Sequence, residues 1–327
     1  MGLLAEGRVQ MTGSDVIRRL RSGERIDRPF FAPVLTGLAA RAGCVTVDDM
    51  YADAAVWTSS LVAAAALFGV DGVVAGYRPD LLLEAHAATD PAEAPALQIA
   101  VDTMRRVFYA CTQDRLGIGA MPGPLTFAAR LEAAGAGSPE CGELKASVVT
   151  AVECICDTRP DLLLLVEDGP LPGGPSPAYR RLYQTVRNVA SYYDIPVGLY
   201  VEGYEVGSLE AYLALGCDVW LAGPSAEGGY GEAVVFAQAA EVPLAVGVGL
   251  AVGDAAAAES LVQLGLELRE AAKSPGVFFT VNEPGTARRA ENLGPQAVPA
   301  ATPKDLHALK AHIDRAGGRP AGKGGTS

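Results

Sequence analysis

Histidine and aromatic residues are scarce in this chain. Its 327 residues include only three histidines, His86, His307 and His312, and 6% aromatic residues. None of the histidines follows a predicted strand, so neither a histidine-based metal site nor a Ser-His-Asp triad is expected. Because half of the residues are hydrophobic, the core must be built mainly from Ala, Val and Leu.

Long basic runs and long hydrophobic runs are also missing. The formal net charge of -12 argues against nucleic acid and anionic membranes as partners. The apolar stretch Leu61–Val70 stops at Asp71, well short of the ~20 residues that span a bilayer. The N-terminus has scattered charges and no signal-peptide core. We therefore predict a cytoplasmic protein that acts on a small molecule.

The six cysteines are dispersed along the chain, which is typical of reduced thiols rather than a disulfide framework. They are Cys44, Cys111, Cys141, Cys154, Cys156 and Cys217. The pair Cys154-x-Cys156 falls in a predicted helix with no second Cys/His pair nearby, so no metal site is expected there.

Short apolar runs alternate with helical patterns, which indicates a (β/α)8 barrel. The predicted strands are Phe30–Leu35, Gly72–Gly76, Leu116–Met121, Leu162–Val166, Val197–Val201, Val219–Ala222, Leu244–Val248 and Val277–Val281. The predicted helices between them include Asp48–Phe68, Pro95–Cys111, Gly142–Asp157, Pro177–Tyr193 and Ala255–Ala272. A doubly wound sheet is the alternative, although no Gly-x-Gly-x-x-Gly turn follows the first strand.

A single domain with two short tails accounts for the whole chain. We predict an N-terminal tail at 1–13, a barrel at 14–316 and a disordered tail, rich in Gly, Pro and Lys, at 317–327. A helix at Met11–Arg21, capped by Thr12 or Ser14, forms a short extension ahead of the barrel.

Polar residues follow most of the predicted strands, and in a barrel such positions line one pocket at the carboxyl ends of the strands. The candidates are Thr36, Arg41, Tyr77, Arg78, Asp80, Thr126, Glu167, Asp168, Tyr200, Glu202, Tyr204, Asn282 and Glu283. Acids that converge raise one another's pKa, so one of them can act as a general acid or base. The arginines can pair with these acids or bind a carboxylate of the substrate. Alternatively, some of the acids simply stabilise helix N-termini.

Several motifs, in their order and spacing, resemble the uroporphyrinogen decarboxylase superfamily, which includes zinc-dependent methyltransferases that use a corrinoid protein. The resemblance extends from about Thr12 to Leu293. Its motifs are Phe68-Gly-Val-Asp-Gly-Val-Val with Pro79-Asp-Leu-Leu, Gly123-Pro-Leu-Thr-Phe, Pro175-Ser-Pro-Ala-Tyr, Ile195-Pro-Val-Gly-Leu, Leu215-Gly-Cys-Asp-Val and Glu291-Asn-Leu.

The resemblance implies a single barrel and a central catalytic aspartate at Asp80. In the decarboxylases that aspartate stabilises a protonated intermediate without any cofactor. Arg41 lies near a family arginine that binds substrate carboxylates. Tyr200 and Glu202 stand where the methyltransferases have zinc-binding His and Cys, and Val281-Asn282-Glu283-Pro284 has no cysteine. Without those soft ligands no zinc, and no other cofactor, is expected.

Three hypotheses follow from these residues. The first is a divergent decarboxylase-like lyase for a small electron-rich carboxylic acid, with Asp80, Glu202 and Glu283 catalytic and the other candidates binding substrate. The second is methyl or one-carbon transfer without the usual zinc, with a corrinoid protein as partner and Glu202 and Glu283 available to a harder metal. The third is a ligand-binding barrel without catalysis. The resemblance also implies a homodimer.

Overall fold

The structure is a computed structural model that describes residues 12–111, 114–135, 137, 139–171, 174–230, 233–234, 238, 244–250, 257–281 and 302–318. Statements about absent features below refer to these residues. The candidates Asn282 and Glu283 lie outside them, as do the motif at Glu291 and most of the predicted tails.

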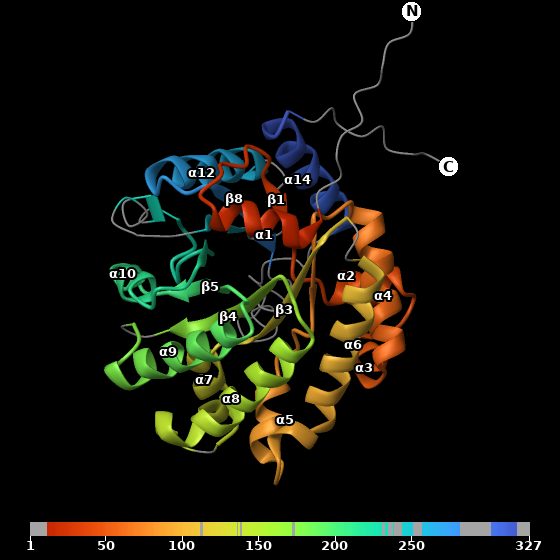
Figure 1. Ribbon diagram of the computed structural model, residues 1–327, viewed down its shortest axis with the longest axis vertical. Helices are drawn as coiled ribbons and strands as arrows, with labels where there is room; N and C mark the ends of the chain where they lie inside the picture. The colour runs from red at the N-terminus through yellow and green to blue at the C-terminus, as the bar shows by residue number, and fades with distance from the viewer. Residues whose placement is uncertain are drawn as a thin grey trace, which may run out of the picture.

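Eight parallel strands form a nearly closed barrel, as the sequence predicts (Figure 1). The strands are β1 (Phe30–Phe31), β2 (Gly72–Ala75), β3 (Leu116–Pro122), β4 (Leu162–Leu171), β5 (Val197–Tyr204), β6 (Val219–Ala222), β7 (Ala245–Leu250) and β8 (Gly276–Val281). Their order in the sheet is β1-β8-β7-β6-β5-β4-β3-β2, with neighbours paired in parallel throughout.

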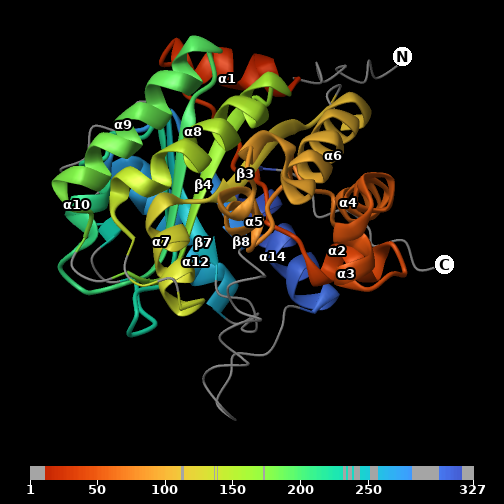
Figure 2. The same ribbon diagram turned by 90° about the horizontal axis from the view of Figure 1, so that it is seen from below.

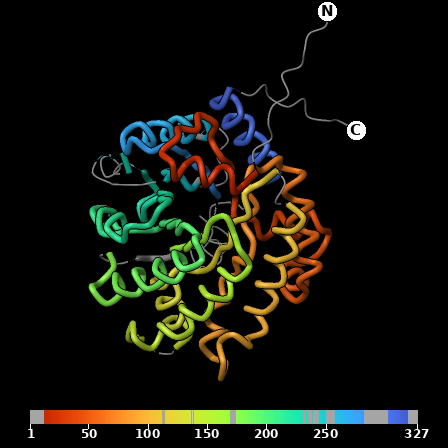
Figure 3. The backbone as a smooth tube through the Cα atoms, in the orientation of Figure 1, coloured from red at the N-terminus to blue at the C-terminus, as the bar shows by residue number. Residues whose placement is uncertain are grey.

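Helices surround the strands, as the tube drawing shows (Figure 3). The longer ones are α1 (Gly13–Arg21), α4 (Ala54–Phe68), α6 (Pro95–Cys111), α7 (Pro124–Ala133), α8 (Cys141–Asp157), α9 (Pro177–Tyr192), α12 (Ala257–Ala271) and α14 (Pro303–Ala316). Shorter ones are α2 (Gly37–Ala42), α3 (Val47–Ala52), α5 (Leu81–Ala87), η1 (Pro91–Glu93) and α10 (Leu209–Leu213).

The side chains form two hydrophobic clusters, one on each face of the sheet. Alternate strand residues such as Val74, Leu164 and Leu221 belong to the cluster inside the barrel. Their neighbours, such as Val73 and Leu163, belong to the cluster between strands and helices. This alternation, which follows from the twofold period of a strand, decides which polar residues can face the barrel interior.

Helix α1 covers the end of the barrel at which the strands begin (Figure 2). Its residues Val16, Ile17 and Leu20 join the interior cluster. Thr12 caps the helix, because its side-chain oxygen accepts a hydrogen bond from the Asp15 N–H at 3.2 Å. With this end closed, the opposite end, where the strands finish, is the end available to a ligand.

Strand β1 ends at Phe31, four residues before its predicted end at Leu35. Two further differences from the sequence prediction concern element boundaries. The predicted helix Asp48–Phe68 is two helices, α3 and α4, because Asp53 adopts an extended backbone and caps α4 through the N–H groups of Ala55 and Val56. Strands β4 and β5 continue several residues past their predicted ends at Val166 and Val201. The second difference determines the geometry of the site.

All six cysteines are free. None of the helices within the described residues is both long and apolar enough to cross a lipid bilayer.

Candidate active site

Two acidic residues face the barrel interior side by side at the carboxyl ends of β4 and β5. Asp168 and Glu202 are partners in the parallel register of the two strands. Each continues the inward-facing alternation of its strand, after Val166 in β4 and Tyr200 in β5. Both acids are buried. The Asp168 side chain is only 1% exposed, and the whole Glu202 residue is 4% exposed.

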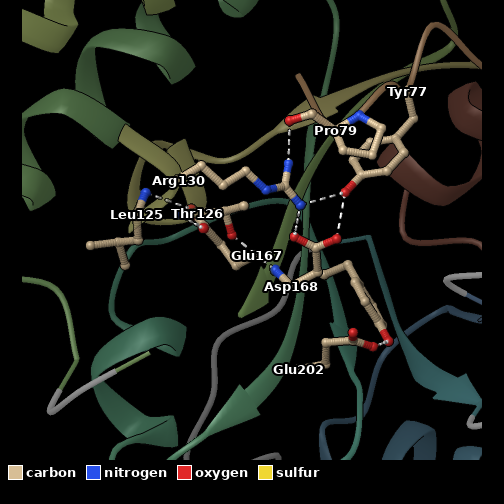
Figure 4. A network of polar contacts seen from close by, with 9 residues as sticks. Tyr77, Pro79, Leu125, Thr126, Arg130, Glu167, Asp168 and Glu202 are labelled. Carbon is tan, nitrogen blue, oxygen red and sulfur yellow. Dashed lines mark hydrogen bonds and ion pairs between the residues drawn. The ribbon is translucent and has the colours of Figure 1, made fainter. Parts of the chain in front are cut away.

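Asp168 is held by two side-chain donors (Figure 4). The Tyr77 hydroxyl donates to Oδ2 at 2.6 Å, and the Arg130 guanidinium donates to Oδ1 at 2.5 Å. Arg130 also donates to the carbonyl of Pro79 at 2.5 Å, so it joins the loop after β2 to the end of β4. Burial, and then the negative charge of Asp168, raise the pKa of Tyr77 well above its usual value. The tyrosine therefore stays protonated, and Arg130 offsets the charge of the acid.

Glu202 receives its hydrogen bond from the Tyr200 hydroxyl, two residues earlier on the same face of β5. Burial and the neighbouring Glu202 charge raise the pKa of Tyr200 well above its usual value. Gly223 and Gly249 make room for this pair, because a Cβ at either position would clash with Tyr200. We call Tyr77, Arg130, Asp168, Tyr200 and Glu202 the mouth cluster.

Glu167, predicted to bind substrate, does not face the mouth. Because β4 continues through it, strand alternation turns its side chain outward, into the layer between the sheet and the helices. Its residue is 0% exposed, and its carboxylate accepts hydrogen bonds from the backbone of α7 and from Tyr183 of α9. The prediction that Glu167 and Asp168 line one pocket is thus corrected.

Three further candidates, Thr126, Thr36 and Tyr204, do not belong to the mouth cluster. Thr126 contacts it through the backbone of Asp168, and the other two are buried elsewhere. The Oγ1 atom of Thr126 accepts a hydrogen bond from the Asp168 N–H at 2.9 Å, which ties α7 to β4. Thr36 is nearly buried and accepts one from the Tyr51 hydroxyl at 3.3 Å. Tyr204 is packed in the outer hydrophobic cluster, so its side chain does not line the barrel interior.

Asp80 lies beside the mouth cluster, at the N-terminus of α5, and is tied to Arg78. The guanidinium donates to both Asp80 carboxylate oxygens, at 2.6 and 2.9 Å, and to Glu84 at 2.6 Å. The Asp80 side chain is 40% exposed, whereas that of Arg78 is 14% exposed. The structure thus places Asp80 on the rim rather than in the barrel interior. Arg41, the other predicted arginine, is exposed in the last turn of α2.

Sequence reasoning missed Arg130, although this residue organises the cluster. It lies in the second turn of α7, seven positions after Gly123, and reaches back to the strand ends. Strand-end reasoning considers only residues that directly follow strands, so a helix residue escaped it. The available signal was a lone arginine on the otherwise apolar first two turns of α7 (Pro124-Leu-Thr-Phe-Ala-Ala-Arg).

No group of three or more His, Cys, Asp or Glu residues suited to a metal ion occurs in the described part of the chain. The Tyr200 hydroxyl donates a hydrogen bond to the Glu202 carboxylate, at the two positions where the family resemblance predicts that zinc-binding His and Cys are replaced. A phenol and a carboxylate are hard donors, so these residues do not fit a structural or thiolate-activating zinc ion.

The comparisons with known proteins bear on the fold. No family model matches the chain, and no curated protein matches it in sequence. A methyltransferase from Methanosarcina mazei is similar in structure, with a TM-score of 0.65 and 13% identity over 93% of this chain and 99% of that chain. A phosphonopyruvate hydrolase (TM-score 0.45, 15% identity, 94% and 98% covered) and a 2,3-dimethylmalate lyase (TM-score 0.43, 14% identity, 97% and 99% covered) are more distant.

At these identities the likeness establishes the barrel fold alone. Kinship with the uroporphyrinogen decarboxylases themselves stays a prediction.

Proposed function

We propose that the protein is a carbon–carbon lyase of the decarboxylase type, which acts on a small electron-rich carboxylic acid at the carboxyl end of the barrel. The observation that carries the proposal is the pair of in-register, inward-facing acids in different surroundings. Asp168 is paired with a cation, Arg130, whereas Glu202 accepts a hydrogen bond from a neutral phenol, Tyr200. Two carboxyl groups in contrasting environments are suited to different proton-transfer roles.

In this proposal Asp168 remains an anion. Its bonds to Arg130 and Tyr77 fix its position at the end of β4. A fixed anion stabilises a substrate that becomes cationic when its ring or double bond is protonated, and that cation is the electron sink for decarboxylation. Asp80, the acid that the family resemblance favours, lies at the rim, where Arg78 offsets its charge.

Glu202 acts as the general acid and base. Its carboxyl proton passes to the substrate carbon, the bond to the carboxylate breaks, and carbon dioxide leaves. The electron pair of the broken bond neutralises the cation. Glu202, now a carboxylate, regains a proton from solvent, so no cofactor or oxidant is needed for the balance. The Tyr200 hydroxyl, which stays protonated, holds Glu202 in place between turnovers.

The test is carbon dioxide release from a panel of small aromatic and heteroaromatic carboxylic acids, followed with 13C-carboxyl-labelled substrates. For any acid that is turned over, E202Q should lower kcat by about 10²–10⁴-fold, the usual contribution of general acid–base catalysis. D168N should be comparably impaired. D102N, a change on the outer surface of α6 where Asp102 pairs with Arg106, is the matched control and should retain full activity. Unchanged turnover in both E202Q and D168N would contradict the proposal, and a loss confined to D80N would transfer the central role to Asp80.

Methyl or one-carbon transfer is the second candidate, and the similarity to the methyltransferase from Methanosarcina mazei favours it. In that case a corrinoid protein or a methylated small molecule would be the donor. Demethylation of a methylated donor separates the two candidates and would replace the lyase proposal. Metal analysis of the purified protein then tells whether that transfer uses a metal, and stoichiometric zinc would overturn the expectation that none is bound.

We also propose a small-molecule ligand and a second copy of the chain as partners. The acidic chain and its small mouth cluster favour a small-molecule ligand. We propose a homodimer on the family resemblance alone, and sedimentation of the purified chain tests it.

A further inference from the structure

Glu167 is a buried carboxylate that the proposed chemistry does not use, and it is bonded at three points. It accepts hydrogen bonds from the N–H groups of Leu125 at 3.2 Å and Thr126 at 2.6 Å, both in the first turn of α7. The Tyr183 hydroxyl of α9 donates to the same carboxylate. Two of the orphan donors at the start of α7 are thereby satisfied by a side chain of β4 (Figure 4).

The backbone around this carboxylate leaves space for it. Gly123, the residue before α7, approaches the Glu167 side chain so closely that any Cβ there would collide with its carboxylate. Its backbone has φ -73° and ψ 164°, a conformation open to every residue, so the requirement for glycine is one of space. A side chain at this position would have to push Glu167 away from α7.

The same helix carries the mouth cluster's cation. Arg130 is one turn further along α7 and donates to Asp168, the residue that follows Glu167 in β4. Thr126 connects the two ends, because its N–H donates to Glu167 while its Oγ1 accepts from the Asp168 N–H. Glu167 on the outer face of β4 and Asp168 on the inner face are thus both hydrogen-bonded to residues of α7.

We propose that Glu167 is a positioning residue, which anchors the start of α7 to β4 so that Arg130 and Tyr77 meet Asp168 in the mouth. The inference rests on the proposed function only in taking Asp168 as a group that touches substrate. It concerns the geometry of the cluster, which can be measured without any substrate.

The charge state of Glu167 makes this anchoring pH-dependent. Burial raises the pKa of Glu167 to about 7, against the opposing effect of its hydrogen bonds from Tyr183 and Thr126. The ionised carboxylate accepts all three bonds, whereas a protonated oxygen must find an acceptor and gives up a donor. The other titratable groups that interact with Glu167 are Tyr179, Tyr183, Tyr212 and Cys217.

Those neighbours do not titrate in the same range. Burial raises the pKa of Tyr179, Tyr183, Tyr212 and Cys217 above their usual values, so all four stay neutral near pH 7. A change of the mouth cluster with a midpoint near pH 7 that is lost in E167Q is therefore attributable to Glu167 rather than to these four groups.

The experiment follows Tyr77 by 13C NMR of the full chain labelled at tyrosine Cζ. The sequence has 11 tyrosines, and Y77F assigns the Tyr77 signal. In the wild type this signal should shift with a midpoint near pH 7, because the ionisation of Glu167 alters how Arg130 and Tyr77 engage Asp168. The step should vanish in E167Q. In G123A, which displaces the carboxylate without changing its charge, the midpoint or the limiting shifts should move.

G142A is the matched control, because nothing lies within 4 Å of a Cβ at Gly142 in the first turn of α8. It should leave the Tyr77 titration unchanged. A Tyr77 signal that is flat through pH 7 in the wild type, or a step that persists in E167Q, would overturn the proposal; if E167Q does not fold, an unaltered Tyr77 titration in G123A would do so.

Turnover adds a second, separate measurement. With a substrate identified as above, G123A should lower kcat by roughly 10- to 100-fold while KM changes little, as expected for a displaced catalytic group. Failure to find any carboxylic acid substrate would remove the lyase proposal and leave the NMR result standing.

Discussion

The two ends of the barrel use acidic residues in different ways. At the end where strands begin, Asp71, Asp161 and Asp218 directly precede β2, β4 and β6. Each carboxylate accepts the backbone N–H of a residue on the preceding strand: Phe31 at 3.1 Å, Gly117 at 2.8 Å and Val197 at 2.8 Å. At the opposite end, Asp168 and Glu202 accept hydrogen bonds from the side chains of Arg130, Tyr77 and Tyr200.

The acids at the two ends differ in whether their hydrogen-bond donors can move. A backbone N–H at a strand start is fixed by the fold, so the acids at that end act as braces between neighbouring strands. Phenol and guanidinium groups rotate about their own bonds, so the acids at the mouth can exchange these donors for a ligand. An acid before a strand is thus expected to support stability, and an acid at the end of a strand to support function.

Removal of Asp71 should cause the largest loss of stability. Its carboxylate is bonded to Arg28 and lies 3.5 Å from Lys310, in addition to the Phe31 N–H. D71A leaves the Arg28 guanidinium without its buried partner, while Lys310 keeps Asp314 at 2.5 Å, and the free energy of unfolding should fall by about 3 kcal/mol or more. Urea denaturation measures the change. D102A, which breaks an exposed pair on α6, should cost no more than about 0.5 kcal/mol; similar losses in the two variants would erase the distinction.

The pH dependence of stability should isolate Glu167. Its pKa is about 7 in the folded protein and near the ordinary glutamate value of 4.5 in the unfolded chain. The folded state therefore binds the proton more tightly, and the stability from this group is complete below pH 4.5 and lost as pH rises to 7. The loss is about 3 kcal/mol. Unfolding free energies of wild type and E167Q should diverge by this amount between pH 4.5 and pH 7.5, and parallel curves would contradict the pKa assignment.

Asp161 should show an intermediate effect. Its two oxygens accept hydrogen bonds from the Gly117 N–H and from the Ser14 hydroxyl at 2.9 Å, which holds α1 against the barrel. D161N keeps one acceptor oxygen and presents an amide donor to the other partner, so it should lower the free energy of unfolding by about 1 kcal/mol. Differential scanning calorimetry can resolve this change, and a stabilised variant would show that the brace is dispensable.

The substitution E202Q should have the smallest effect on the free energy of unfolding. E202Q retains an acceptor for the Tyr200 hydroxyl and replaces the carboxyl group next to Asp168 with a neutral amide of similar size. The free energy of unfolding should therefore stay within about 0.5 kcal/mol of the wild type or rise, while activity falls. A loss as large as that of D71A would mean that the mouth acid, too, is structural.

The fold could be predicted from the sequence because every strand contains or lies within a short apolar run. The predicted and observed limits of β6 coincide, and those of β2 and β3 differ by one residue. Prediction was less accurate where polarity and strand geometry disagree. The apolar pattern predicts that the two strands end just before Glu167 and Glu202, because charged residues normally mark the end of a strand. In the structure β4 and β5 continue through both residues.

That boundary error explains what was missed at the site. Residues in a loop can all point toward one pocket, whereas successive residues in a strand point to opposite faces. Extending β4 by two residues therefore separates Glu167 from Asp168. Arg130 was missed for a different reason. The lone arginine in α7 is a local signal, but its contact with Asp168 depends on how α7 packs against β4.

The hydrogen bonds of Asp71 at the closed end bear on how the barrel can open. Seven ladders join the eight strands in series, and β1 and β2 are the two strands left at the ends of that series. Asp71 spans this seam twice, through its own N–H to the Phe31 carbonyl at 2.8 Å and through its carboxylate to the Phe31 N–H at 3.1 Å. Closure of the circle thus depends largely on one residue. The opening of lowest free energy in the barrel should lie along this line, where two strands can part while all seven ladders stay intact.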